Sequence, residues 1–251
     1  MSAFANGFVL DGKVAIVTGA AAGIGQAVAE LLAAQGARLM LVDLDAQVSE
    51  LARSLPGEHE TLVGDVSSLE FIDLIVKSTE EKFGTIDILV NNAGVSMLNK
   101  AVDLTVEQWD RTMSINLRAP FFLSRSVAKV MQKRGGGRIV NIASQAAVIA
   151  LDKHVSYCAS KAGMVSMTEV LAVEWAGDGI TVNAVSPTVV ETPLGKRAWA
   201  GALGEEMRKK IPVGRFAQPD EISAAVLYLV SEHTKIITGA NLMIDGGYTI
   251  Q

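Results

Sequence analysis

Thr18-Gly-Ala-Ala-Ala-Gly-Ile-Gly25 joins a short apolar run, Val14–Thr18, to a helix-period segment at residues 24–35. An apolar run without polar alternation is typical of a parallel strand that is buried on both faces. Glycines between such a strand and a helix permit a tight turn and let a phosphate reach the free N–H groups at the helix start. The pattern predicts a dinucleotide-binding turn, although an ordinary tight βα turn is the alternative. The residues expected to bind the cofactor here are Gly19, Gly23, Ile24 and Gly25.

Strand-like and helix-like segments alternate along the remaining chain. Further strands are expected at residues 38–42, 61–64, 86–90, 138–143, 181–185 and 241–244, and helices at 46–53, 69–83, 106–132, 156–176 and 220–230. Pro120 is expected to break or kink the helix at 106–132, because proline lacks a backbone N–H. This order predicts an α/β fold, a Rossmann-type doubly wound parallel sheet of about seven strands in a three-layer α/β/α arrangement, as a single domain over residues 1–251.

The composition fits one large globular domain and argues against several other classes of protein. The chain has 251 residues, is 49% hydrophobic and carries a formal net charge of −5 without a basic cluster, which disfavours nucleic-acid binding. Its single cysteine, Cys158, excludes an internal disulfide and a cysteine-based zinc cage, and no metal site is predicted. No leader pattern and no membrane-length apolar run are found, so a soluble cytoplasmic protein without a membrane partner is expected.

Acidic residues follow the second and third expected strands, at the edge of the sheet where ligands bind in such folds. Asp43, followed by Leu44, is placed to accept hydrogen bonds from the adenosine ribose hydroxyls. A 2′-phosphate would meet like charge there, so NAD is predicted over NADP. The alternative is that Asp43 only caps the next helix. Asp65 and Val66 are expected at the adenine edge, where a solvated loop aspartate is the alternative.

Small and amide residues follow the fourth expected strand in Asn91-Asn-Ala-Gly94. Their size suits a place where the backbone must approach a cofactor closely. We therefore expect Asn92, Ala93 and Gly94 to contact the dinucleotide.

Further polar side chains form a candidate proton-handling site, namely Asn116, Ser144, Tyr157 and Lys161. Tyr157 and Lys161 are separated by one helical turn and therefore share one face of a helix. A free tyrosine has a pKa of about 10, which is too high for a base at neutral pH. A nearby ammonium group and a positive nicotinamide ring would favour the tyrosinate. The simpler alternatives are a surface pair of residues for Tyr157 and Lys161 and a strand-end serine for Ser144.

In this order and spacing, the motifs resemble those of the short-chain dehydrogenases/reductases of the conventional single-domain type. The resemblance covers the chain from about Leu10 to its C-terminus. It is carried by the glycine turn, Asn91-Asn-Ala-Gly94, Asn116, Ser144, Tyr157-Cys-Ala-Ser-Lys161 and Ile244-Asp-Gly-Gly247.

The resemblance implies a role for each residue of the proton-handling site. Tyr157 would be the general acid/base, and Lys161 would hold the nicotinamide ribose and lower the tyrosine pKa. Ser144 would orient the substrate oxygen, and Asn116 would support a proton-relay water. Further cofactor contacts are implied for Tyr157, Lys161, Pro187, Val190 and Thr192. This chain departs from the family where Pro187-Thr188 replaces the usual Pro-Gly.

Polar residues around the expected centre favour a hydroxyl-rich substrate, because a desolvated hydroxyl without a partner is costly. The candidates are Ser144, Gln145, His154 and Thr188, with Trp199 in an expected substrate lid at about residues 188–212. For His154 the alternative is an ordinary loop histidine, and for Trp199 it is subunit packing.

Residues 144–154, 186–192 and 243–251 also resemble a polyol-oxidising branch of the family. This implies NAD-dependent interconversion of a secondary alcohol of a small polyol, a tetritol such as D-threitol or another sugar alcohol, and the corresponding ketose. The alternative is an NAD(P)H-dependent reductase of another carbonyl substrate, such as a 3-oxoacyl thioester. A non-catalytic dinucleotide-binding regulator is disfavoured, because all members of the proton-handling site are present.

The expected helix at residues 156–176 carries apolar side chains on more than one side. The family resemblance implies that this helix and the one at 106–132 pack against a partner subunit. A homotetramer is therefore predicted, with a dimer as the alternative.

Overall fold

The computed structural model describes residues 8–251, which contain a parallel sheet of seven strands in the order β3-β2-β1-β4-β5-β6-β7. Every neighbouring pair of strands runs parallel. The expected α/β doubly wound sheet is therefore confirmed. The strands are β1 (Val14–Thr18), β2 (Arg38–Asp43), β3 (His59–Val63), β4 (Ile88–Asn91), β5 (Gly137–Ile142), β6 (Ile180–Pro187) and β7 (Asn241–Ile244).

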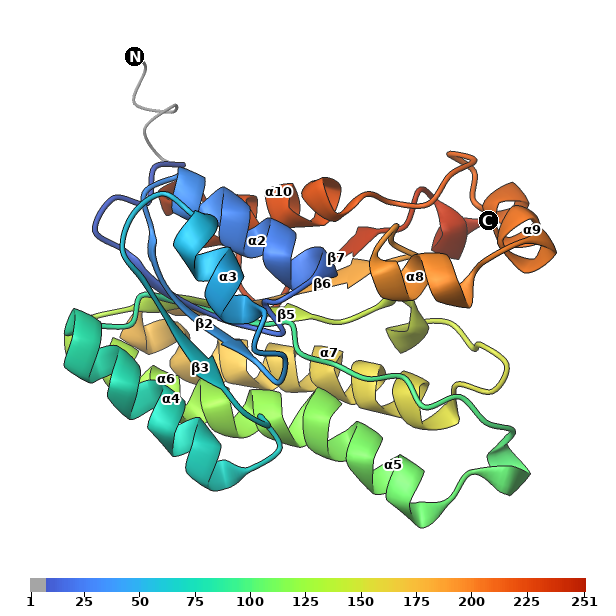
Figure 1. Cartoon of the computed structure of the whole chain (residues 1–251), viewed down its shortest axis with the longest axis horizontal. Helices are drawn as coiled ribbons and strands as arrows, with labels where there is room; N and C mark the ends of the chain where they lie inside the picture. The colour runs from blue at the N-terminus through green and yellow to red at the C-terminus, as the bar shows by residue number, and fades with distance from the viewer. Residues whose placement is uncertain (1–7) are drawn as a thin grey trace.

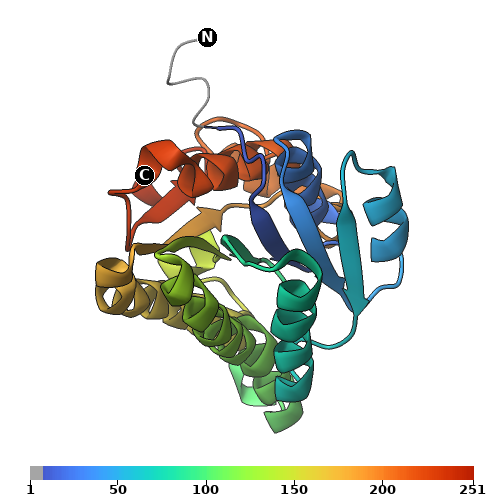
Figure 2. The ribbon, with the colours of Figure 1, turned by 90° about the vertical axis from the view of Figure 1, so that its left-hand side faces the viewer.

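Helices cover both faces of the sheet, which gives the three expected layers (Figures 1 and 2). On one face, α2 (Gly23–Ala34), α3 (Val48–Ser54) and α10 (Pro219–Val230) bury an apolar cluster against the strands. On the other face, α4 (Leu69–Phe83), α6 (Ala119–Arg134) and α7 (Val155–Trp175) bury a second cluster. All residues of β1 are buried, as its unbroken apolar run predicts.

The remaining helices stand beyond the carboxyl edge of the sheet or mark short turns. The helices α8 (Pro193–Ala198) and α9 (Ala202–Lys210) fill the segment expected to be a lid, and they project past β6 and β7 (Figure 1). Short 3₁₀ turns are η1 (Ala101–Asp103), η3 (Gln145–Ala147), η4 (Ala176–Asp178), η5 (Glu232–Thr234) and η6 (Tyr248–Ile250).

The segment expected as one helix at residues 106–132 is divided differently from the prediction. It consists of α5 (Val106–Met113), the π-helical turn η2 (Ser114–Arg118) and α6. Pro120 lies in the first turn of α6, where its missing N–H is tolerated. The irregularity therefore precedes the proline, and the Ala119 N–H bonds to the carbonyl of Ser114. Such π-turns often occur at functional sites.

The chain order reverses at β1, which has β2 on one side and β4 on the other. In open parallel sheets, ligands bind beyond the carboxyl ends of the strands at such a switch point. The glycine turn, Asp43 and Asn92 all follow strands at this place. None of the helices within residues 8–251 is long and apolar enough to cross a membrane.

Candidate active site

The glycine turn is packed too closely for side chains. A Cβ on Gly19 would lie 2.8 Å from the Cα of Ala93, and a Cβ on Gly25 would overlap the carbonyl oxygen of Gly19. Gly19 and Gly23 also have φ angles of 66° and 61°, which a residue with a Cβ rarely adopts. At the start of α2, Ala22 is the N-cap and provides no side-chain hydrogen bond. The first N–H groups of this helix therefore have no capping side chain and can donate hydrogen bonds to a phosphate.

The loop after β4 is fastened to this turn by hydrogen bonds. The Thr18 hydroxyl oxygen accepts from the backbone N–H groups of Asn92 and Ala93, each at 3.1 Å. In return, the Asn92 amide nitrogen donates to the carbonyl oxygens of Thr18 at 3.0 Å and Gly19 at 2.9 Å. These bonds fix the relative position of the two loops that form the centre of the switch point.

A groove of about 550 Å³ runs along the carboxyl edge over β1, β2 and β4. It brings together most of the residues that the sequence predicted to bind a cofactor. Gly25 lies behind the turn, against the Gly19 carbonyl and the Asn92 amide. The predicted residues that line the groove are Gly19, Gly23, Ile24, Asp43, Leu44, Asp65, Val66, Asn92, Ala93, Gly94 and Thr192.

Asp43 is anchored at the end of β2 and does not cap the following helix. Its Oδ2 accepts from the backbone N–H of Ala21 at 2.8 Å, and its Oδ1 accepts from Asp45 at 2.9 Å. The helix α3 has Gln47 as its N-cap. Asp43 thus ties the glycine turn to β2 and keeps acceptor capacity toward the groove, since each carboxylate oxygen can accept more than one hydrogen bond.

Asp65 forms an ion pair that the sequence did not reveal. Its Oδ2 accepts from Arg111 on α5 at 2.7 Å, and its Oδ1 accepts from the backbone N–H of Ser67 at 2.9 Å. Burial alone would raise the pKa of Asp65, but these hydrogen bonds outweigh it and hold that pKa below its ordinary value. Arg111 also lines the groove. No local pattern marks Arg111 as a partner, because it is distant from Asp65 in sequence.

Asn116 lies in the π-turn η2 and forms hydrogen bonds with the loop after β4. Its amide nitrogen donates to the carbonyl oxygen of Val95 at 2.8 Å and to the Ser160 hydroxyl at 3.1 Å. Its Oδ1 accepts from the Val95 N–H at 2.9 Å. Asn116 is completely buried, so the extra residue of the π-turn places a polar side chain between the β4 loop and α7.

Tyr157 and Lys161 share one face of α7, as their spacing predicted. The ammonium of Lys161 donates to the carbonyl oxygen of Ile142 at 2.6 Å and lies 5.8 Å from the centre of the Tyr157 ring. Lys161 is only 4% exposed. A surface pair is therefore excluded, and the lysine is a buried cation at the end of β5.

Burial sets the acid–base properties of both side chains. It raises the pKa of Tyr157, an effect that a hydrogen bond with the Ser144 side chain partly offsets. It also lowers the pKa of Lys161 from 10.5 to about 8. The expectation that Lys161 lowers the tyrosine pKa together with a bound nicotinamide ring stays a prediction. Desolvation disfavours the charged form of each group.

A smaller cavity of about 190 Å³ contains this pair. Ser144, Tyr157, Lys161 and Thr188 line it, and Pro187 and Val190 complete its wall. Ile24, Asn92, Gly94 and Val95 line both this pocket and the larger groove. The two spaces therefore adjoin, and a ligand that fills the groove would reach the Tyr157 pocket past Gly94.

Two of the predicted substrate residues carry buried oxygens without a hydrogen-bond partner. Gln145 is 3% exposed and Thr188 is 8% exposed. Within the described part of the chain, neither the Oε1 of Gln145 nor the Oγ1 of Thr188 has a partner. Most buried polar groups in proteins are hydrogen-bonded. Thr188 lines the Tyr157 pocket and is therefore a candidate for ligand contact, whereas Gln145 is not among the residues that line this pocket.

The structure gives His154 and Trp199 different surroundings. The ring centre of His154 lies 6.1 Å from that of Tyr157, and its Nδ1 is 2.5 Å from the carbonyl oxygen of Asp152. Trp199 packs against Phe216, with ring centres 6.4 Å apart, in a cluster with Met207 and Ile211. Trp199 therefore takes part in the internal packing of the α8–α9 segment, and its contact with a substrate stays a prediction.

Comparison with known proteins identifies the family. A family model described as enoyl-(acyl carrier protein) reductase matches residues 19–249. The chain belongs to the short-chain dehydrogenases/reductases. An NAD-dependent glycerol dehydrogenase of Listeria innocua is 52% identical over 99% of this chain and 98% of the relative. A D-threitol dehydrogenase of Mycolicibacterium smegmatis is 51% identical over 97% of this chain and 95% of the relative.

Solved structures of this short-chain dehydrogenase/reductase fold agree with the sequence comparison. A putative NAD(P)-dependent gluconate 5-dehydrogenase from Beutenbergia cavernae superimposes with a TM-score of 0.93. It is 34% identical, over 97% of this chain and 99% of that structure. A 3-oxoacyl-[acyl-carrier-protein] reductase of Thermotoga maritima is less similar than the two polyol dehydrogenases, at 38% identity over 96% of this chain and 99% of the relative.

Proposed function

We propose that this chain is an NAD-dependent polyol dehydrogenase that interconverts a secondary alcohol of a small polyol and the corresponding ketose. The observation that carries the proposal is the continuity of the groove with the Tyr157 pocket through Gly94 and its neighbours. A dinucleotide whose phosphates lie at the glycine turn would place its far end beside Tyr157. An oxidoreductase needs this juxtaposition of cofactor and proton-handling residue.

The residues of the pocket would handle the proton while the cofactor handles the hydride. Bound NAD would supply the hydride acceptor for the substrate carbon and a positive charge beside the Tyr157 phenol. Tyr157 would take the hydroxyl proton of the alcohol, and Ser144 would donate a hydrogen bond to the same substrate oxygen. Lys161 would hold the nicotinamide ribose, and its charge would favour the tyrosinate. In the reverse direction, Tyr157 would protonate the reduced carbonyl.

Asp43 supports NAD as the cofactor. Its carboxylate lines the groove at the end of β2, where the ribose of the adenosine would lie. The next residue is Leu44, so no basic side chain at this position could pair with a 2′-phosphate. A 2′-phosphate at this point would meet a negative charge, whereas ribose hydroxyls would donate hydrogen bonds to it. The NAD-dependent relative from Listeria innocua agrees with this choice.

The substrate class rests on the polar wall of the pocket and on the two polyol dehydrogenase relatives described above. Thr188 lines this pocket with a hydroxyl that lacks a partner in the described part of the protein. A polyol could donate a hydroxyl proton to Thr188 while its reacting hydroxyl contacts Ser144 and Tyr157. The segment at about residues 188–212, which contains α8 and α9, would serve as the lid over this substrate.

The test is a measurement of NADH or NADPH formation over a panel of polyols from glycerol through the tetritols, D-threitol included, to the hexitols. We expect activity with NAD and at least one polyol, and a much lower catalytic efficiency with NADP. A chain that oxidises none of these polyols but reduces a 3-oxoacyl thioester with NADPH would overturn the proposal. Binding of NAD, followed by protein fluorescence, separates failure of the cofactor site from failure of the substrate choice.

We also propose that the chain acts in the cytoplasm as a homotetramer. Apolar side chains on α5 and α7 support an interface there, since Val106 is 70% exposed, Val170 is 52% exposed and Val173 is 81% exposed. Such exposure on two helices suits burial by a partner subunit. Light scattering at micromolar concentration should give a tetramer, and a monomer would contradict this proposal.

A further inference from the structure

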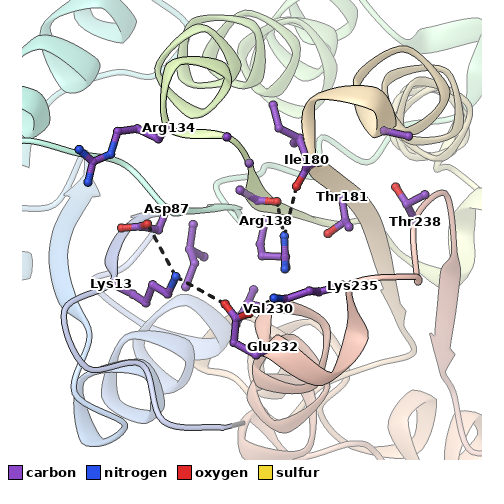
Figure 3. A pocket seen from close by; sticks show the side chains of 16 residues that line it. Lys13, Asp87, Arg134, Arg138, Ile180, Thr181, Val230, Glu232, Lys235 and Thr238 are labelled. Carbon is purple, nitrogen blue, oxygen red and sulfur yellow. Dashed lines mark hydrogen bonds and ion pairs between the residues drawn. The ribbon is translucent and has the colours of Figure 1, made fainter.

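A second cavity lies at the amino edge of the sheet, opposite the candidate active site. Its volume is about 410 Å³, and its wall includes the starts of β5 and β6, the residue before β1 and the segment after α10. Figure 3 shows the charged side chains Lys13, Arg138, Glu232 and Lys235 around it. Nothing in the proposed dehydrogenase reaction uses this cavity.

Arg138 and Thr181 form the floor of this cavity. They are register partners on the neighbouring parallel strands β5 and β6, so their side chains leave the same face of the sheet. Thr181 is 5% exposed, and its hydroxyl has no partner in the described part of the chain. The Nε of Arg138 is also buried without a partner there, although Nη1 of the same guanidinium donates to the carbonyl oxygen of Gly137 at 2.9 Å.

Both of these unpartnered groups can donate a hydrogen bond. The guanidinium is only a donor, and the hydroxyl carries one donatable proton. What the floor of the cavity lacks is therefore an acceptor. Buried donors without acceptors are uncommon in native proteins, and the pairing of two such groups on adjacent strands points to a ligand that carries oxygen atoms.

The charges around the cavity favour an anionic ligand. Four cationic side chains line it, Lys13, Arg134, Arg138 and Lys235, against the two carboxylates Asp87 and Glu232. Lys13 lies 4.0 Å from Asp87 and 3.5 Å from Glu232, and Lys235 lies 2.6 Å from Glu232. The four cations outnumber the two carboxylates, so the lining of the cavity carries an excess of two positive charges, which a doubly charged anion would neutralise.

We propose that this cavity binds a phosphate group, either as inorganic phosphate or as part of a small phosphorylated metabolite. Arg138 Nε and the Thr181 hydroxyl donate to the phosphate oxygens from the floor of the cavity. Lys235 and Lys13 contribute charge from its rim. The site lies at the amino edge of the sheet and Tyr157 at its carboxyl edge, so the bound anion does not touch the substrate or the nicotinamide.

The competing explanation is that the cations serve the protein alone. The helices α6 and α10 end at this edge with Arg134 and Val230, and helix C-termini attract positive charge. In that case the cations balance the helix ends and the two carboxylates, and water bonds to Thr181. This explanation predicts no response to phosphate beyond that of ionic strength.

The experiment measures the thermal midpoint of unfolding of the full chain, saturated with NAD, against the concentration of inorganic phosphate or glycerol 3-phosphate. Saturating NAD keeps phosphate out of the dinucleotide groove, and sodium chloride at equal ionic strength provides the reference. A saturable rise with phosphate supports the proposal. Tighter binding of glycerol 3-phosphate than of phosphate identifies a phosphorylated metabolite as the ligand, and equal or weaker binding identifies free phosphate.

Two variants and one control locate the effect. Thr181→Val removes only the unpartnered hydroxyl and should weaken phosphate binding about fivefold to tenfold without lowering the midpoint of the phosphate-free protein. Lys235→Gln should weaken phosphate binding by a similar factor. Lys129→Gln, an exposed lysine on α6 outside the cavity, should leave it unchanged. The absence of a saturable response in the wild type, or equal responses in all three variants, overturns the proposal.

Discussion

The dinucleotide groove and the Tyr157 pocket adjoin at the carboxyl edge of one sheet, yet their polar side chains differ in whether the protein itself provides their hydrogen-bond partners. In the groove, Asn92 and Asp43 are bonded to the backbone of the glycine turn. In the pocket, Thr188 keeps a buried hydroxyl without a partner in the described chain. The polar groups of the groove are paired within the protein, whereas the Thr188 hydroxyl of the pocket would be paired only by a ligand.

This difference indicates that the groove residues determine cofactor binding and that the pocket determines substrate choice. Groove residues hold loops together, so changing them should alter the fold of the turn as well as the affinity for NAD. The Thr188 side chain bonds to none of these loops, so changing it should alter substrate use and leave NAD binding intact. Each prediction below tests one side of this division.

The largest expected effect is on turnover, from Tyr157→Phe. Loss of the phenolic proton should reduce kcat about 10²–10⁴-fold, the usual contribution of a general acid or base. The Kd for NAD should remain within about twofold, because the Tyr157 hydroxyl does not hold the groove loops together. Steady-state kinetics and NAD titration measure the two quantities. Retention of more than a tenth of the wild-type kcat would remove Tyr157 from its proposed role.

Lys161→Met should produce the next largest effect, a gain of stability combined with a loss of activity. The fall of the Lys161 pKa from 10.5 to about 8 corresponds to about 3 kcal/mol of destabilisation at neutral pH. Loss of the hydrogen bond to the Ile142 carbonyl should offset about 1 kcal/mol of the stability gained by removing the buried ammonium group. The variant should therefore unfold at higher urea concentration than the wild type near pH 7.

The pH dependence gives this prediction a definite sign. Between about pH 8 and about pH 10.5, the unfolded chain keeps the Lys161 proton and the folded chain releases it. Stability contributed by this residue therefore rises with pH over that range, and the advantage of Lys161→Met over the wild type should shrink. Lys129→Met, at an exposed position, is the matched control. An advantage that grows with pH would contradict the burial of Lys161 as an ammonium group.

Much of the groove and of the Tyr157 pocket could be predicted, because the sequence patterns that indicate them are local. The glycine turn, Asp43 and the Tyr157–Lys161 spacing each follow a recognisable strand or lie within a single helix. Arg111 could not be predicted, since it meets Asp65 only when α5 folds over the β3 loop. The π-turn before Pro120, the packing of Trp199 on Phe216 and the raised pKa of Tyr157 likewise depend on tertiary contacts that no local pattern encodes.

A smaller effect is expected on cofactor choice, from Asp43→Asn. The amide keeps the shape but loses the charge that ribose hydroxyls would meet, so the catalytic efficiency with NAD should fall about tenfold. The efficiency with NADP should change less or rise, because a repelling charge is gone. The ratio of the two efficiencies is the measurement. An unchanged ratio would show that Asp43 serves only Ala21 and Asp45.

The smallest expected effect tests the division between groove and pocket most directly. Thr188→Val removes a buried hydroxyl that has no partner in the protein, at almost constant volume. The Kd for NAD and the KM for the best polyol should be measured on the same preparations of wild type and variant. We predict an unchanged Kd, a KM raised about fivefold through loss of one hydrogen bond, and a thermal midpoint that does not fall. A weakened Kd for NAD with an unchanged KM would contradict the account.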